Sequence, residues 1–285
     1  MQSMMIVLGR LAVAASVWAL FVPPAAAGVR YRVEGQSETT TISMPDPIAA
    51  NRGPSEPGRP APPPPSPKRT TSGPLRTSAD VLVEGANIRI DNFRLDPRQN
   101  SAHEEFFIST DAGASFEIVN LARVTRTRFP FEVSLAPNVM PMRSFSGRLA
   151  PAITDLEMKR GASAAGGVIG GYDTVLHSVR VSFGVPENNA FRRPPMKVTA
   201  EIKVWMTSGV PARIPPGLQA WATGFAAADA ALLRTMHDVE GFPMRTVTRL
   251  RMDSRRDQMT TVSTLEVKDI TIEEIPPALF EVPSH

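Results

Sequence analysis

Cysteine is absent from the sequence. Its absence excludes disulfide bonds, thiol nucleophiles, cysteine-based metal sites and a lipid anchor on an amino-terminal cysteine. The excess of positive over negative charge is also small, since 31 Lys and Arg residues are balanced by 28 Asp and Glu residues and leave a formal net charge of +3 over 285 residues. The basic residues are scattered along the chain. A protein dedicated to nucleic-acid binding would concentrate them on one face or arm, so we expect no nucleic-acid partner.

Residues suited to catalysis or metal binding are few as well. The only histidines are His103, His177, His237 and His285, and no G-x-S-x-G motif accompanies them. The densest group of possible metal ligands is His103 with Glu104 and Glu105, but adjacent side chains usually point apart and make a poor ligand set. We therefore expect no enzyme activity, no bound metal and no cofactor.

The first 27 residues have the pattern of a secretory signal peptide. Arg10 precedes an apolar run over Leu11–Val22, two prolines end it, and Ala25–Ala27 offers a small-x-small cleavage pattern. A transmembrane anchor is the less favoured alternative, because a span of about 20 apolar residues would have to bury Arg10. We expect cleavage after Ala27 and a periplasmic mature protein with no transmembrane anchor.

Proline is abundant, and eleven of the 28 prolines lie between Pro45 and Arg76. Large apolar residues are nearly missing from this stretch, so it cannot bury enough surface to offset the entropy lost on ordering. The composition predicts a disordered, extended insertion that acts as a spacer. The alternative is a docking segment for an aromatic-lined groove on a partner protein of the cell envelope.

The rest of the mature chain alternates apolar and polar residues, as strands do. The clearest case is a pair of predicted strands in which every second residue lies on one face. In the first strand these residues are Val175, His177, Val179, Val181 and Phe183, and in the second they are Val198, Ala200, Ile202, Val204 and Met206. The two runs are joined by roughly a dozen residues and predict a long antiparallel pair. A lone inward-facing histidine such as His177 is more often a hydrogen-bonded core residue than a catalyst or ligand.

One helix stands out from the strands. Apolar residues recur at three- and four-residue steps, at Leu218, Trp221, Phe225, Ala228, Leu232 and Met236, between Gly217 and Gly241. Roughly nine or ten strands accompany this helix. The pattern predicts a mainly β (α+β) fold, in which a curved antiparallel sheet, or half-barrel, is covered by one or more helices.

The order of several short segments carries a family resemblance. Gly171–Thr174 leads into the strand with His177, Glu201–Thr207 and the helix follow, and Gly241–Arg245 and Ile275–Pro283 close the chain. In this order the chain resembles uncharacterised secreted bacterial domains similar to the lipoprotein-localisation-factor (Lol-type) superfamily of periplasmic carriers. The resemblance implies one half-barrel domain over residues 28–285, interrupted by the insertion at 45–76, with a concavity that holds acyl chains.

The helix stripe and the strands opposite it form the predicted ligand-binding surface. Its residues are Leu218, Trp221, Phe225, Leu232 and Met236 from the helix, and Val175, His177, Val179, Val204 and Met206 from the strands. This surface predicts a non-catalytic periplasmic carrier or sensor for a hydrophobic ligand such as a lipid or a lipoprotein acyl chain. The alternative is a structural or interaction module of the envelope, with a filled core, that docks a protein partner through its Pro-rich segment.

Overall fold

A single antiparallel sheet dominates the computed structural model of the chain. The structure describes residues 28–44, 66–94, 105–111, 115–120, 125–130, 152–187, 194–212, 226–236, 238–255 and 257–281. The predicted signal peptide at 1–27 lies outside the described residues. No helix in the described ranges is long and apolar enough to cross a membrane.

Within the described residues the sheet consists of thirteen strands. They are β1 (Gly28–Ser43), β2 (Lys68–Thr71), β3 (Leu75–Glu84), β4 (Asn87–Arg94), β5 (Glu105–Ser109), β6 (Ser115–Asn120), β7 (Thr125–Pro130), β8 (Thr154–Arg160), β9 (Ala164–Ile169), β10 (Tyr172–Val185), β11 (Met196–Thr207), β12 (Phe242–Ser254) and β13 (Asp257–Glu273). Two short helices, α3 (Ala226–Thr235) and the 3-10 helix η3 (Pro277–Phe280), complete the described elements.

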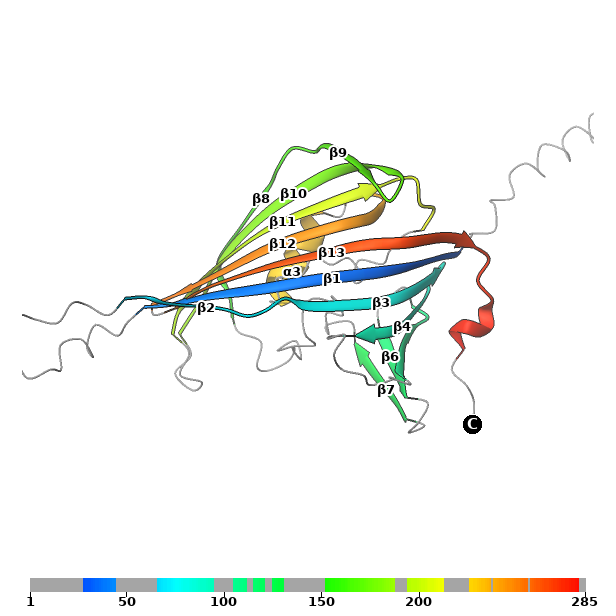
Figure 1. The fold of residues 1–285 in the computed structure, drawn as a ribbon, viewed down its shortest axis with the longest axis horizontal. Coiled ribbons are helices and arrows are strands. Elements are labelled where there is room, and N and C mark those ends of the chain that lie inside the picture. The colour runs from blue at the N-terminus through cyan, green and yellow to red at the C-terminus, as the bar shows by residue number, and fades with distance from the viewer. Residues whose placement is uncertain are drawn as a thin grey trace, which may run out of the picture.

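The strand order shows how the two ends of the chain meet. It runs β7-β6-β5-β4-β3-β1-β13-β12-β11-β10-β8, with β2 paired to β1 and β9 paired to β10 (Figure 1). Neighbours along most of this order are consecutive in sequence, but β1 pairs with β13 from Gly28↔Glu273 to Ser43↔Asp257. The first strand therefore joins two meanders, β3 to β7 and β8 to β13, into one open sheet.

The two faces of the sheet differ because side chains alternate along every strand. We call the face that carries Val179 the inner face and the face that carries Arg180 the outer face. Residues directly opposite in an antiparallel pair share a face, so the register extends the inner face from Val204 through Thr246 to Leu265. All three of these residues are buried.

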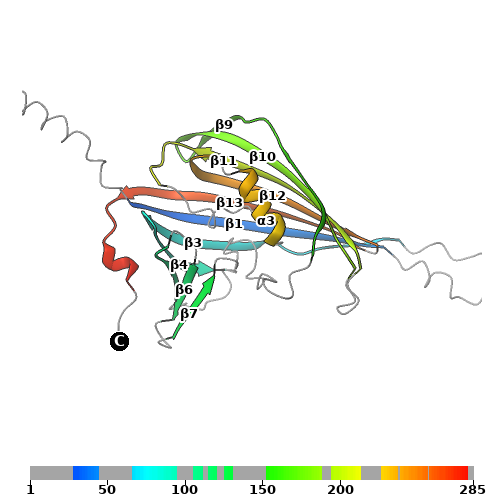
Figure 2. The ribbon, with the colours of Figure 1, turned by 180° about the vertical axis from the view of Figure 1, so that it is seen from behind.

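Helical cover is much smaller than the sequence predicts. The mainly β, antiparallel sheet is confirmed, but within the described residues α3 is a helix of ten residues and is the only α-helix. It lies against the inner face (Figure 2) and packs on part of β10 and β11 through Ala228, Leu232 and Met236. The first half of the predicted helix stripe lies outside the described residues.

The Pro-rich insertion is shorter than predicted. Its residues 45–65 lie outside the described residues, but Lys68–Thr71 form β2 and pair with the end of β1, from Thr40↔Thr71 to Ser43↔Lys68. Leu75 and Arg76 already belong to β3. The prediction of disorder up to Arg76 is wrong at this end, because threonines favour a strand and an unpaired edge of β1 is within reach.

Candidate functional site

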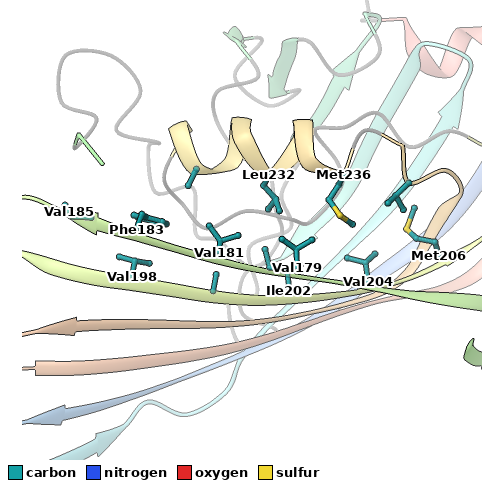
Figure 3. Packing of buried hydrophobic residues seen from close by; sticks show 13 residues of the cluster. Val179, Val181, Phe183, Val185, Val198, Ile202, Val204, Met206, Leu232 and Met236 are labelled. Carbon is teal, nitrogen blue, oxygen red and sulfur yellow. The ribbon is translucent and has the colours of Figure 1, made fainter. Parts of the chain in front are cut away.

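The candidate site is the inner face of β10 and β11 together with the helix packed on it. Figure 3 shows Val179, Val181, Phe183, Ile202 and Val204 pointing from the strands toward α3, and Leu232 and Met236 pointing back. None of these side chains is more than 4% exposed. The result is a buried, wholly apolar layer with flexible methionines at one end, where Met206 and Met236 belong to the same cluster.

The strand pair beneath the helix is regular. Val179 faces Ile202 and Val181 faces Ala200 in unbroken antiparallel register, from Val175↔Met206 to Val185↔Met196. The alternation of β-branched and polar residues in both strands places every second side chain on the inner face. These strands carry the sheet side of the surface that the sequence predicts to be ligand-binding.

Polar contacts hold the end of the helix to the edge of the sheet. Arg160 on β8 donates from Nη1 to both carboxylate oxygens of Asp238, at 2.6 and 2.7 Å. The Thr235 hydroxyl donates to the Ala231 carbonyl and lies 3.3 Å from the Met158 sulfur on β8. The carboxyl-terminal end of α3 is thus attached to β8, while its apolar face covers β10 and β11.

A second apolar cluster continues the inner face across β12, β13, β1, β3 and β4. Its buried members include Val29, Tyr31, Val81, Phe242 and Met244. The Tyr31 and Phe242 rings meet edge to face, with centroids 5.1 Å apart. Burial raises the pKa of the Tyr31 hydroxyl well above its ordinary value, so the phenol stays neutral.

The structure brings together five of the predicted site residues. Val179, Val204, Met206, Leu232 and Met236 all belong to the cluster beneath α3. Leu218, Trp221 and Phe225 lie outside the described residues.

Val175 is misplaced in the prediction. It is 45% exposed, because it lies at the bulge between β9 and β10, beyond the part of β10 that α3 covers. Parity alone assigned it to the buried face, and parity does not show where along a strand the cover ends.

Several residues of the site were missing from the predicted set. Val181, Phe183, Val198, Ala200 and Ile202 are all buried in the same cluster. They occupy the same alternate positions of β10 and β11 as the predicted site residues, so the alternation in the sequence also indicates them.

His177 lies at the rim of the site and is only partly buried. Its Nδ1 lies 3.0 Å from the Ser163 hydroxyl, which fits the predicted hydrogen-bonded structural role but not a position deep in the core. Burial and the positive charge of Arg160 lower the pKa of His177, and the carboxylate of Asp238 partly opposes them. The imidazole is therefore biased toward its neutral form.

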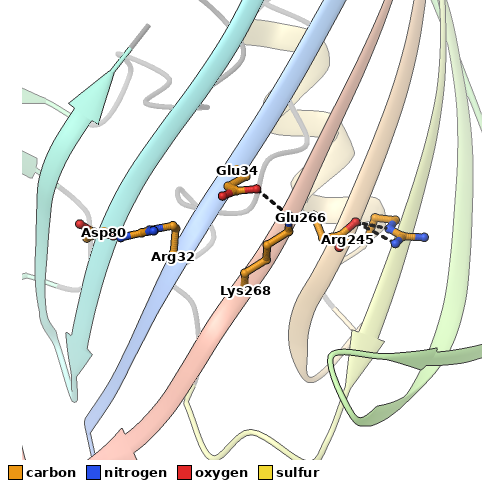
Figure 4. Close-up of polar contacts among 6 residues, drawn as sticks. All are labelled: Arg32, Glu34, Asp80, Arg245, Glu266 and Lys268. Carbon is orange, nitrogen blue, oxygen red and sulfur yellow. Dashed lines mark hydrogen bonds and ion pairs between the residues drawn. The ribbon is translucent and has the colours of Figure 1, made fainter. Parts of the chain in front are cut away.

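The outer face carries rows of charged side chains that bridge neighbouring strands. Figure 4 shows Arg32 with Asp80, Glu34 with Lys268, and Arg245 with Glu266, at 2.9, 2.6 and 2.7 Å. Glu34 and Glu266 lie directly opposite each other in register, and each is neutralised by its own cation. The guanidinium of Arg245 also lies 5.9 Å from the centre of the Trp205 ring.

The described residues contain no group of three or more His, Asp or Glu side chains arranged to hold a metal ion. Of the densest set of possible ligands in the sequence, His103 and Glu104 lie outside those residues and Glu105 begins β5. The described side chains between α3 and the strands are apolar.

Comparison with known proteins finds one structure of low similarity. No family model matches the chain, and no curated protein matches it. Among solved structures, one described as "lipid-protein interactions in lipovitellin" is similar with a TM-score of 0.34 and 8% sequence identity, over 88% of this chain. The chain spans 26% of the length of that structure. A likeness at this level identifies neither a fold family nor a ligand.

Proposed function

We propose that the mature protein is a non-catalytic periplasmic binding protein for a hydrophobic ligand, such as an acyl chain, which lies against the inner face beside α3. The apolar layer formed by β10, β11 and α3 supplies the contact surface. The predicted signal peptide and the resemblance to Lol-type carriers are consistent with the proposed location and ligand class. In this proposal the curved sheet acts as a half-barrel and α3 acts as part of its cover.

The observation that carries the proposal is the extent of the apolar inner face. Buried apolar side chains continue across neighbouring strands from β4 through β3, β1, β13, β12 and β11 to β10. The single α-helix in the described part of the chain has ten residues and packs on the β10–β11 end of this face. A long apolar surface beside a short helix suits an elongated apolar ligand.

The side chains of this surface also suit a ligand of variable shape. Met206, Met236 and Met244 are buried on the inner face, and methionine adapts its unbranched side chain to irregular neighbours. Each Å² of apolar surface that a ligand removes from water contributes about 25 cal/mol. No charged side chain is among the buried residues of the described part of the chain, so binding would depend on contact area rather than on a charged group.

Native mass spectrometry of the protein purified from its own cells tests the proposal first. We expect an added mass of lipid size that is lost after delipidation. The delipidated full mature chain is then titrated with 11-(dansylamino)undecanoic acid, with palmitate as the competitor. We expect saturable dansyl fluorescence that palmitate reverses.

A matched pair of variants locates the binding on the inner face. Val204→Phe enlarges a fully buried inner side chain beside α3, and Val262→Phe makes the same change on the exposed outer face of β13. We expect Val204→Phe to weaken dansyl binding and Val262→Phe to leave it unchanged, with circular dichroism to show that both remain folded. If Val204→Phe does not fold, Ala228→Val on α3 replaces it. A folded, delipidated wild type without saturable binding would mean that the inner face is a filled core.

A further inference from the structure

A hollow on the outer face carries a second set of organised residues, on the side of the sheet opposite the proposed acyl site. The hollow has a volume of about 470 Å³, within the range of small-molecule sites. Arginine and aspartate side chains from β1, β3, β4 and β13 line most of it, and Leu82 and Leu279 add apolar surface.

Two β-bulges lie on opposite sides of this hollow. In the β3–β4 pair, Asn92 and Phe93 oppose the single residue Ala79, and in the β1–β13 pair, Asp269 and Ile270 oppose Tyr31. The first residue of each bulge has a left-handed backbone, with φ of 51° at Asn92 and 52° at Asp269. Asparagine and aspartate are, after glycine, the residues that favour this conformation, so each bulge places a polar side chain at a fixed position.

The side chains at the bulges lead to a central ion pair between them. Asn92 donates from Nδ2 to Asp80 Oδ2 at 2.7 Å, and Arg32 donates from Nε to Asp80 Oδ1 at 2.9 Å. Asp269 lies on the far side of Arg32 and contributes to its raised pKa, after the hydrogen bond and charge of Asp80. A row of polar groups, Asn92–Asp80–Arg32–Asp269, therefore crosses four neighbouring strands.

The balance of charge in the hollow favours a neutral ligand over an ion. Three arginines (Arg30, Arg32 and Arg89) and three aspartates (Asp80, Asp91 and Asp269) line it, so their formal charges sum to zero. Arg30 Nε lies 3.1 Å from Oε1 of Glu273, and this carboxylate adds a further negative charge, which disfavours an anion.

The groups in the hollow also alternate in their hydrogen-bonding character. Arg30 and Arg32 make their ion pairs through Nε, so their Nη groups can donate to a ligand. The amide oxygen of Asn92 and the carboxylate of Asp269 can accept. Hydroxyl groups both donate and accept, and charged partners strengthen such hydrogen bonds.

We infer that this hollow is a binding site for a saccharide of one or two rings. Ring hydroxyls would bind between the arginine N–H groups and the acceptors of Asn92 and Asp269, and the C–H face of the ring would contact Leu82 and Leu279. The two bulges hold Asn92 and Asp269 in place for this contact, at the expense of a less favourable backbone. This inference is independent of the acyl site, which lies on the other face.

Glycine substitutions separate the backbone from the side chain. Asn92→Gly and Asp269→Gly remove a ligand contact while suiting the left-handed backbone. Asp155→Gly is the matched control, because Asp155 has a φ of 53° at a third bulge, between β8 and β10, and does not line the hollow. The full mature protein is titrated with methyl glucoside, methyl mannoside, methyl galactoside and N-acetylglucosamine, followed by ¹H–¹⁵N chemical shifts. Inorganic phosphate and lysine serve as charged comparison ligands.

We expect saturable shifts with at least one saccharide. Asn92→Gly and Asp269→Gly should each weaken its binding by roughly tenfold, the effect of one lost hydrogen bond. All three variants should remain folded, because the left-handed backbone suits glycine, and Asp155→Gly should bind as wild type does. The inference is overturned if only phosphate or lysine binds, if no saccharide binds saturably at millimolar concentration, or if the three variants bind equally.

Discussion

Over much of its width, the sheet has two faces of opposite physical character that come from the same strands. The inner face buries valines, isoleucines and methionines beneath α3, whereas the outer face holds half-exposed ion pairs such as Arg32–Asp80 and Arg245–Glu266. Burial of a large apolar side chain contributes about 1.5–3 kcal/mol, but a surface ion pair contributes about 0–1 kcal/mol. Over this part of the sheet the inner face therefore supplies most of the stability, and the ion pairs of the outer face help to fix the strand register. Toward β4–β6 the outer face is apolar as well, because Leu82, Phe106, Ile108 and Val119 are buried there with Phe280 of η3.

The largest test of this difference places a carboxylate on each face. Val181→Asp puts a charge at an inner position that is 0% exposed, and Val262→Asp puts the same group at an outer position that is 42% exposed. We expect Val181→Asp to reduce the unfolding free energy by about 4 kcal/mol or more, because nothing pairs the buried group. Val262→Asp should change it by less than about 0.5 kcal/mol. Urea denaturation followed by circular dichroism measures both, and equal losses would contradict the assignment of the faces.

A substitution that creates a cavity between α3 and the sheet should have the next largest effect on the unfolding free energy. Leu232→Ala removes a fully buried side chain of α3 and should reduce the unfolding free energy by about 2–5 kcal/mol. Leu156→Ala, on the edge strand β8, is the control, because Leu156 is 38% exposed and should cost less than about 1 kcal/mol. If Leu232→Ala were as mild as its control, α3 would contribute little to the inner face.

Much of this architecture was predictable from the sequence. The β10–β11 pair was predicted in its correct register parity, because valine and isoleucine alternate with polar residues through both strands. The apolar steps at Ala228, Leu232 and Met236 likewise predicted the face that α3 packs on the sheet. Local periodicity is a sufficient signal for both features.

Other features depend on contacts between distant residues, which periodicity does not encode. The pairing of Val33 with Val267 and the bulges at Asn92 and Asp269 follow from the meeting of β1 with its neighbours in space. The segments that form β2, β8 and β9 contain few large apolar residues and are hard to separate from loops, so the predicted number of nine or ten strands is lower than the thirteen found in the described residues. For the same reason the limit of helical cover, which left Val175 exposed, could not be predicted.

On the outer face, Arg245→Gln sharpens the comparison with a smaller effect. Arg245 donates to Glu266 from Nε at 3.0 Å and from Nη2 at 2.7 Å, and both side chains are partly buried. We expect a loss of about 1 kcal/mol in unfolding free energy that shrinks at high salt. Lys203→Gln is the control, since its Nζ lies 3.9 Å from Glu201 and should contribute almost nothing. A salt-independent loss for Arg245→Gln would point to its contact with the Trp205 ring instead.

The smallest expected effect concerns His177, a polar residue with the parity of the inner face. Burial and Arg160 lower its pKa in the folded state, so below about pH 6.5 the unfolded chain binds more protons at this position than the folded chain. His177 should therefore contribute a decrease in unfolding free energy as the pH falls from about 7 through the unfolded pKa toward the folded one. His177→Gln should flatten this part of the pH profile, since glutamine does not titrate. Ser163→Ala serves as the control, because it removes the hydrogen bond to Nδ1 but leaves the titrating ring in place and should retain the slope. If the slope between pH 7 and pH 5 were the same in wild type and His177→Gln, the imidazole would be as well solvated as the charged groups of the outer face. The buried part of the inner face would then stop at Val179 and not reach His177.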